Sequence, residues 1–111
     1  MSETEFLNLA DATLRTIESG TEYAAEACDM DVECSRSGNV LEIEFIENGY
    51  KIIVNSQAPL HEMWVAAKSG GFHYKRIDAQ WINTRDGTEL FAALSLMISA
   101  QGGKTLRLSD Q

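Results

Sequence analysis

The feature that most constrains the fold is a series of short segments with alternating apolar and polar residues between positions 29 and 84. Tight turns separate them, and Asn48-Gly49 is a strong signal for a two-residue hairpin. Strands that follow one another through hairpins pair antiparallel, because parallel pairing needs a long crossover connection. We therefore predict an antiparallel sheet of about six strands. The predicted strands cover residues 29–34, 41–45, 50–55, 60–68, 71–77 and 80–84.

A helix is predicted before this strand region. Ser2 and Glu5 have the spacing of a capping box, which marks a helix start. Apolar or small residues then recur on one helical face: Phe6, Leu9, Ala10, Thr13, Leu14 and Ile17. We place the end of this helix between Gly20 and Ala27.

A second helix is predicted after the strands, from Asp86 to Gly102-Gly103. The tail that follows alternates Leu106 and Leu108, and we expect it to pack against the body. Both helices can cover only one face of a meander sheet. The prediction is an α+β, two-layer α/β sandwich with two terminal helices on one face, as a single domain over residues 1–111. The other face of the sheet would be open to partners.

Charge is unevenly distributed along the chain. The net charge is −8, and residues 1–47 hold 12 of the 17 acidic residues against two basic ones. Such a field repels phosphate, so neither nucleic acid nor a membrane surface is expected as a partner. No run of 18 apolar residues occurs and the N-terminus is acidic, so we expect a cytoplasmic protein. Cys28 and Cys34 are then expected to be free thiols.

Many of these acids fall on one stripe of the first helix and on the segment after it. We call this set the acidic ridge: Asp11, Glu18, Glu22, Glu26, Asp29, Asp31 and Glu33. Like charges at i, i+4 destabilise a helix slightly, so such a stripe has a cost. Carboxylate oxygens suit hard cations such as Fe²⁺, Fe³⁺, Mn²⁺ and Ca²⁺. We expect weak, multiple and poorly selective binding. The alternative is a solvated face that only keeps the protein in solution.

A second candidate surface surrounds the only proline of the chain. Asn55 and Gln57 precede it, and strand alternation puts Glu62 and Trp64 on one face of the next strand. If that face is the uncovered one, an indole lies among amides, as in protein-recognition surfaces. The alternative is that Trp64 packs into the core under the helices.

In several motifs the chain resembles the frataxin family. The residues that carry the resemblance are Asn55-x-Gln57-x-Pro59 with Trp64, then Gly70-Gly71-Phe72-His73-Tyr74, Trp81, Asp86-Gly87 and the opening Glu5-Phe6-x-x-Leu9-Ala10-Asp11. Their order is similar to the bacterial, CyaY-type branch, from Ser2 to about Leu108.

The resemblance implies a protein that takes part in and regulates iron–sulfur cluster assembly. It implies that the ridge binds Fe²⁺ and Fe³⁺ weakly and reversibly, without an organic cofactor. It also implies that Asn55, Gln57 and Trp64 contact partners, namely the cysteine desulfurase and the cluster scaffold protein. We include Glu62 in this partner-binding set because it shares a face with Trp64. A monomer is expected, in a bacterial cytoplasm, with metal-driven oligomers left open.

Two other functions remain as alternatives. One is a metal-independent acidic interaction module that modulates a basic partner enzyme. The other is an enzyme with weak ferroxidase activity, which ranks lowest because such centres need inward carboxylates and histidine on facing helices. One departure from the family concerns Glu62, which stands where many members have glutamine and so adds a negative charge beside Trp64.

Overall fold

The computed structural model describes residues 1–109. Helix α1 runs from Glu3 to Ala27. The predicted capping box is confirmed, because the Glu5 N–H donates to Ser2 Oγ at 3.1 Å and the Ser2 N–H donates to Glu5 Oε1 at 3.2 Å. The helix continues through Gly20 to the later of the two predicted ends. It buries one face, made of Phe6, Ala10, Thr13, Leu14, Ile17, Thr21 and Ala25.

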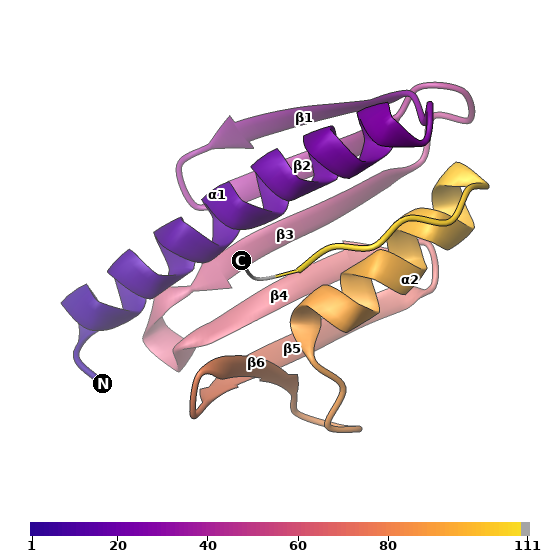
Figure 1. Cartoon of the computed structure of the whole chain (residues 1–111). Coiled ribbons are helices and arrows are strands. Elements are labelled where there is room, and N and C mark those ends of the chain that lie inside the picture. The colour runs from indigo at the N-terminus through magenta and orange to yellow at the C-terminus, as the bar shows by residue number, and fades with distance from the viewer. Residues whose placement is uncertain (110–111) are drawn as a thin grey trace.

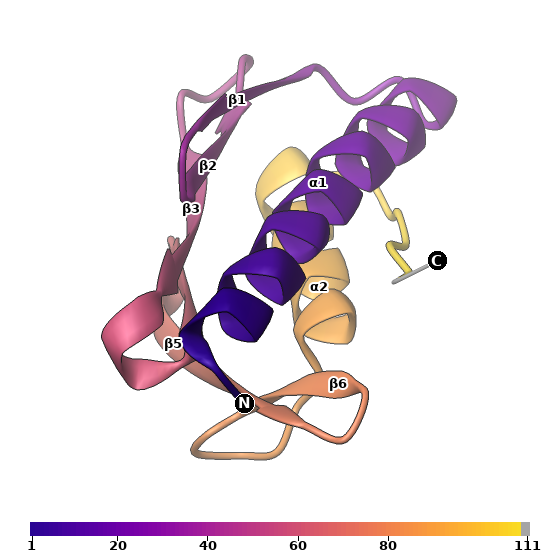
Figure 2. The same ribbon diagram turned by 90° about the vertical axis from the view of Figure 1, so that its left-hand side faces the viewer.

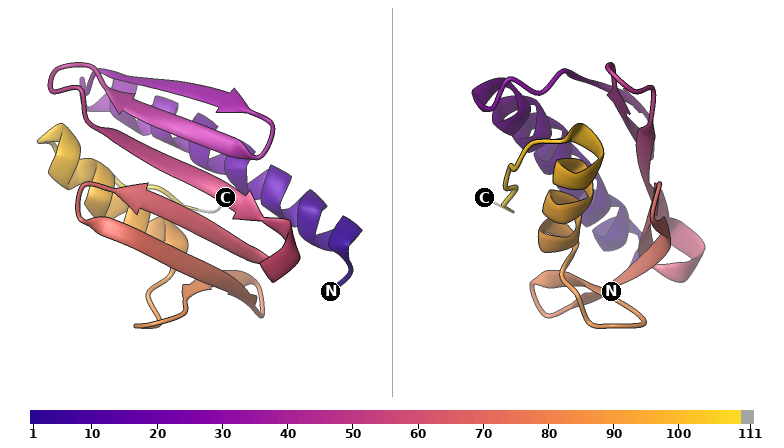
Figure 3. Two further views of the ribbon diagram at one scale, coloured as in Figure 1. Left: turned by 180° about the vertical axis from the view of Figure 1, so that it is seen from behind. Right: turned by 90° about the vertical axis from the view of Figure 1, so that its right-hand side faces the viewer.

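Six strands form one sheet in the order β1-β2-β3-β4-β5-β6, each antiparallel to its neighbour. They are β1 (Val32–Ser37), β2 (Val40–Phe45), β3 (Lys51–Gln57), β4 (Glu62–Ala67), β5 (Gly70–Ile77) and β6 (Gln80–Asn83), with a 3₁₀ turn η1 (Ala58–Leu60) before β4. Figure 1 shows α1 across the β1–β3 half and α2 (Leu90–Gly102) across the other half. Both helices lie on the same side of the sheet, and its other face is uncovered (Figures 2 and 3). The predicted fold class is confirmed.

The predicted strand over residues 29–34 begins too early. Asp29 has a left-handed backbone (φ 58°) and Met30 turns inward, where its side chain is 7% exposed. The Met30 N–H donates to Ala25 O at 2.8 Å, which closes the end of α1. The chain therefore makes a turn over residues 28–31, and Asp29 and Asp31 lie in this turn instead of a strand.

The second helix begins later than predicted. Asp86 accepts the Thr88 N–H at 2.9 Å in a turn, and Gly87 has φ 77°, which a right-handed helix cannot include. Glu89 is the N-cap instead, and its carboxylate accepts the N–H groups of Phe91 and Ala92. The predicted stop is confirmed, with Gly103 at φ 74° as the C-cap.

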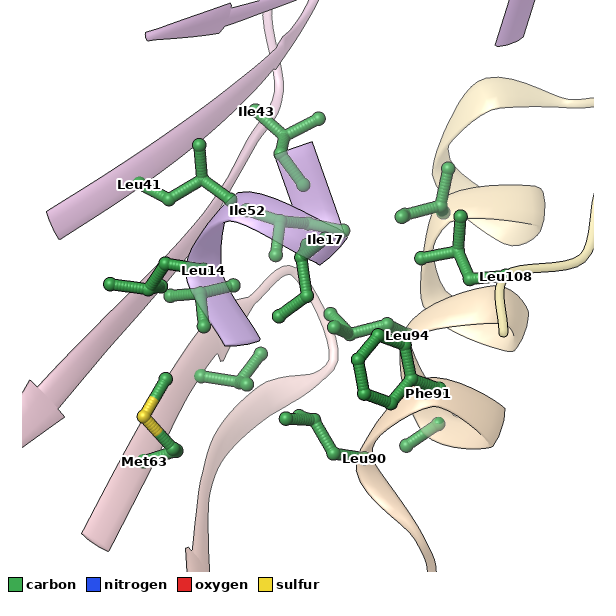
Figure 4. Close-up of a cluster of buried hydrophobic side chains, with 14 of the residues drawn as sticks. Leu14, Ile17, Leu41, Ile43, Ile52, Met63, Leu90, Phe91, Leu94 and Leu108 are labelled. Atoms are coloured by element: carbon green, nitrogen blue, oxygen red, sulfur yellow. The ribbon is translucent and has the colours of Figure 1, made fainter. Parts of the chain in front are cut away.

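The core lies between the helices and the sheet (Figure 4). Trp81 of β6 is 1% exposed, and its indole N–H donates to Thr13 Oγ1 of α1 at 2.9 Å. The predicted packing of the tail is confirmed, since Leu106 and Leu108 are 8% and 5% exposed. The Leu108 N–H also donates to Ser95 Oγ of α2 at 2.8 Å. Within residues 1–109, no helix combines the length and apolar character needed to cross a membrane.

Candidate functional site: the acidic ridge and the open face of the sheet

Glu18 and Glu22 lie over the edge strand β1. The Cys34 side chain of β1 packs on the core side, as does its partner Ile43 in β2. The pKa of the Cys34 thiol is raised to about 12, chiefly by burial and in addition by the charges of Glu22 and Glu18. Glu18 is half-buried and Glu22 is exposed, so both carboxylates stay open to water on α1 next to β1.

Asp11 differs from the other members of the ridge because it already has two cationic partners. Arg36 of β1 donates to the Asp11 carboxylate, and Arg15 lies 3.3 Å from it one helical turn on. The hydrogen bond from Arg36 is the main reason that the pKa of Asp11 lies below its usual value. The carboxylate ties α1 to β1, and the uncompensated part of the ridge begins at Glu18.

The far end of the ridge is formed by the last turn of α1 and the turn after it. Glu26, Asp29 and Asp31 are all exposed there. The last turn of α1 has no basic residue, and the partial negative charge of a helix C-terminus adds to that of the carboxylates. At this end Lys104 Nζ donates to Asp29 O at 2.6 Å and lies 4.0 Å from the Asp29 carboxylate.

Glu33 lies on the other face of β1 from Glu18 and Glu22. Along β1, Cys34 and Arg36 face α1, so the alternating Glu33 points to the uncovered face. There it lies directly opposite Glu44 of β2, a like-charge pair that sequence reasoning missed. Only the strand register reveals this pair, because Glu44 alternates normally with the core residues of its own strand.

Across residues 1–109, no group of three His, Cys, Asp or Glu side chains is arranged closely enough to hold a metal ion. Over the same residues, Glu18, Glu22, Glu26 and Asp31 have no Lys, Arg or His within ion-pairing distance. Within this range, these four form a row of unpaired carboxylates, and Glu33, on the other face of β1, is not part of that row. A cation that binds to the row would keep much of its own hydration.

The uncovered face of the sheet holds the second candidate surface, which we call the docking face: Asn55, Gln57, Glu62 and Trp64. In β4, Met63 and Val65 are buried against the helices, so Trp64 points the other way and is only half-buried. Asn55 lies opposite Trp64 in the β3–β4 ladder, and Gln57 lies opposite Glu62. The open-face alternative is therefore the correct one for Trp64. The tryptophan of the core is Trp81.

Two contacts hold the Trp64 indole on this face. Its Nε1–H donates to Glu62 Oε1 at 2.8 Å. The His73 ring, from the opposing position of β5, is stacked on it with ring centroids 4.2 Å apart and planes 5° apart. His73 was not among the predicted site residues, because its sequence position says nothing of the register that brings it opposite Trp64.

The comparisons with known proteins agree with this architecture. A family model described as frataxin-like domain matches residues 1–104. Proteins named iron-sulfur cluster assembly protein CyaY are similar over nearly the whole chain. That of Janthinobacterium sp. (strain Marseille) is 67% identical over 99% of this chain and 98% of its own length. That of Cupriavidus pinatubonensis (strain JMP 134 / LMG 1197) is 56% identical, over 97% and 96%.

Solved structures of the same fold are also similar. Frataxin from Psychromonas ingrahamii superposes with a TM-score of 0.87 at 36% identity, over 98% of this chain and 99% of that one. Trimeric frataxin from the yeast Saccharomyces cerevisiae, complexed with ferrous iron, superposes with a TM-score of 0.73 at 26% identity, over 86% of each chain. The match to the family model, the identity with these relatives and the shared fold together show that this chain belongs to the frataxin family.

Proposed function

We propose that this protein binds iron weakly on its acidic ridge and regulates iron–sulfur cluster assembly by docking on the assembly machinery. The observation that carries the proposal is the row of uncompensated carboxylates of Glu18, Glu22, Glu26 and Asp31 along one side of α1 and the turn after it. The proposal is supported by the names of the relatives and by the yeast frataxin complexed with ferrous iron.

The metal in this proposal is cargo that binds and leaves. Carboxylates bind Fe²⁺ and Fe³⁺ as hard ligands, and repulsion among them in the free protein adds to the gain on binding. Without a preformed cage, each ion is held by one or two side chains and by water. Asp11 belongs to the ridge by position, but its ion pairs with Arg15 and Arg36 make it a weak candidate ligand.

The partners in this proposal are the cysteine desulfurase and the cluster scaffold protein. The strongly negative α1 side would attract a basic surface of the desulfurase and speed encounter. The docking face would contribute the aromatic anchor, because tryptophan is enriched among the residues that dominate binding energy. The protein acts in this scheme as a monomeric regulator and not as an enzyme.

A cluster-assembly assay with purified desulfurase and scaffold, run with and without this protein over a range of iron concentrations, tests the proposal. We expect Glu18→Gln combined with Glu22→Gln to weaken metal binding about tenfold, or about 1.4 kcal/mol, and to reduce the iron-dependent effect on assembly. The matched control is Glu3→Gln with Asp78→Asn, which removes the same charge at exposed sites away from the ridge. An equal effect of both double variants would contradict a role for the ridge.

The alternative is an acidic module that docks without metal. It is favoured by the finding that no three candidate ligands converge within residues 1–109. Binding to the desulfurase in the presence of a chelator separates the two functions. Full affinity and full effect on assembly without iron would support the alternative, and strict iron dependence would rule it out.

A further inference from the structure

Glu62, the first residue of β4, is unusually buried for a carboxylate on the uncovered face of a sheet. Its side chain is only 11% exposed, although it lies on the uncovered side. A carboxylate removed from water is costly unless it is paired. Three groups surround it: Trp64 Nε1 at 2.8 Å, His73 Nδ1 at 3.8 Å and Lys75 Nζ at 3.9 Å. All three come from β4 and from the neighbouring strand β5.

Trp64 is the residue that this arrangement immobilises. A half-buried indole on a solvated sheet would otherwise exchange among rotamers. Here the Glu62 carboxylate accepts its N–H at one end, and the His73 ring covers one face of the indole. His73 is itself 48% exposed by its side chain, so it is held mainly by this stacking and by its proximity to Glu62.

We propose that Glu62 is a positioning residue that, together with His73, fixes the Trp64 indole in the orientation used for partner docking. The proposal rests on the proposed docking function of this face. Preorganisation matters because immobilising a flexible side chain on binding costs affinity. One consequence concerns recognition: the indole N–H is already donated to Glu62, so a partner contacts the free edge of the ring and the amides of Asn55 and Gln57.

Two substitutions at Glu62 separate the effect of its hydrogen bond to Trp64 from the effects of side-chain size and charge. Glu62→Met keeps the volume and removes the acceptor. Glu62→Gln keeps an oxygen that can accept the Trp64 N–H but removes the charge that faces Lys75 and His73. The matched control is Glu42→Gln, because Glu42 is a half-buried carboxylate of β2 that pairs with Lys51 at 3.4 Å and does not contact Trp64.

The first measurement uses the free protein and its two indole N–H signals, from Trp64 and Trp81, in NMR spectra. We expect Glu62→Met to shift the Trp64 signal and speed its exchange with water while the Trp81 signal stays unchanged. Glu62→Gln should keep the Trp64 signal protected. Glu42→Gln should change neither signal. His73→Ala, which leaves the Glu62 carboxylate with its contacts to Trp64 and Lys75, should broaden or shift the Trp64 signal if Glu62→Met fails to fold.

The second measurement is the Kd for the desulfurase and for the scaffold protein. We expect Glu62→Met to weaken docking about three- to tenfold and Glu62→Gln to restore it to within about twofold of the natural protein. Docking at full affinity in Glu62→Met, while Trp64→Ala weakens it, would overturn the positioning role alone. Unchanged docking in Trp64→Ala would instead overturn the proposed use of this face, whatever the indole signals show.

Discussion

The guanidinium of Arg36 in β1 donates to the carboxylate of Asp11 in α1, and so joins the edge of the sheet to the helix that covers it. Arg36 keeps only 19% of its side chain exposed, while Asp11 keeps 50%. A residue that sequence pattern assigns to the metal-binding ridge thus has a role in the contact between the two layers. Substitutions can separate a role of Asp11 as a metal ligand from its role in joining α1 to β1.

We expect Asp11→Asn to lower the free energy of unfolding, because it removes the negative charge that faces Arg36 and Arg15. The same substitution should leave the metal titration of residues 18–31 unchanged. Glu18→Gln is the opposite case, and should weaken metal binding without loss of stability. Thermal denaturation and an NMR titration with a redox-inert cation measure the two effects. A loss of metal affinity in Asp11→Asn would show instead that Asp11 is a metal ligand.

The contribution of Asp11 should depend on pH. Its pKa is lower in the folded protein than in the unfolded chain, chiefly because Arg36 donates to the carboxylate. The stabilisation is therefore fully present above the unfolded pKa of about 3.9, and is lost as the pH falls through the folded pKa. In urea denaturation, the natural protein and Asp11→Asn should differ most near pH 7 and least near pH 2. A difference that does not change with pH would contradict the ion-pair explanation.

Cys34 should report on cations at Glu18 and Glu22. With its pKa raised to about 12 by burial and by the charges of Glu22 and Glu18, the thiol is almost fully protonated at pH 8. Since the thiolate is the nucleophile, we expect alkylation at least about a thousandfold slower than for a free cysteine. A bound cation would offset the two carboxylate charges and accelerate alkylation. Burial, the largest cause, would remain.

The measurement is the alkylation rate in a Cys28→Ser background, with Mn²⁺ or a lanthanide added at increasing concentration. In the Glu18→Gln, Glu22→Gln variant the basal rate should rise and the dependence on metal should disappear. If metal accelerates alkylation equally in this variant, the cation is not bound at these two side chains.

Truncation of the two tryptophans should have different effects, mainly on stability for Trp81 and mainly on docking for Trp64. Trp81→Ala should cost about 3–5 kcal/mol of stability, because it opens a cavity in the core and leaves Thr13 without its donor. Trp64→Ala should cost about 1 kcal/mol and weaken docking on the desulfurase or the scaffold protein. Chemical denaturation and a binding titration test both. A cost of about 3 kcal/mol or more at Trp64 would mean that its indole supports the core.

Local signals in the sequence predicted most of the fold. The capping box at Ser2 and Glu5, the reversal of the chain near Asn48-Gly49 and the period-2 alternation of the strands depend on neighbours within a few residues, so they can be recognised without tertiary structure. The predicted two-residue turn is wrong in length, because residues 46–50 connect β2 to β3.

Three misplaced starts, those of the predicted strands at Asp29 and Leu60 and of the predicted helix at Asp86, have one cause. Each lies where a left-handed residue, Asp29 itself, His61 or Gly87, turns the chain, and alternation or capping patterns do not show the sign of φ. In the second case His61 has φ 53°, and β4 begins only at Glu62.

The candidate site also has some features that the sequence predicts and others that only the structure reveals. The amino-acid order alone determined that carboxylates line one side of the first helix and that Glu62 and Trp64 share a face, because helical and strand periods are properties of the backbone. Only the tertiary structure decided which face of the sheet the helices cover, that Asp11 meets Arg36, that Glu33 lies opposite Glu44, and that His73 stacks on Trp64. Asp11 and Arg36 are 25 positions apart, so their contact depends on how the helix packs on the sheet. The other two pairs face each other across hairpins, where the turn geometry sets the register that the alternation of residue types does not show.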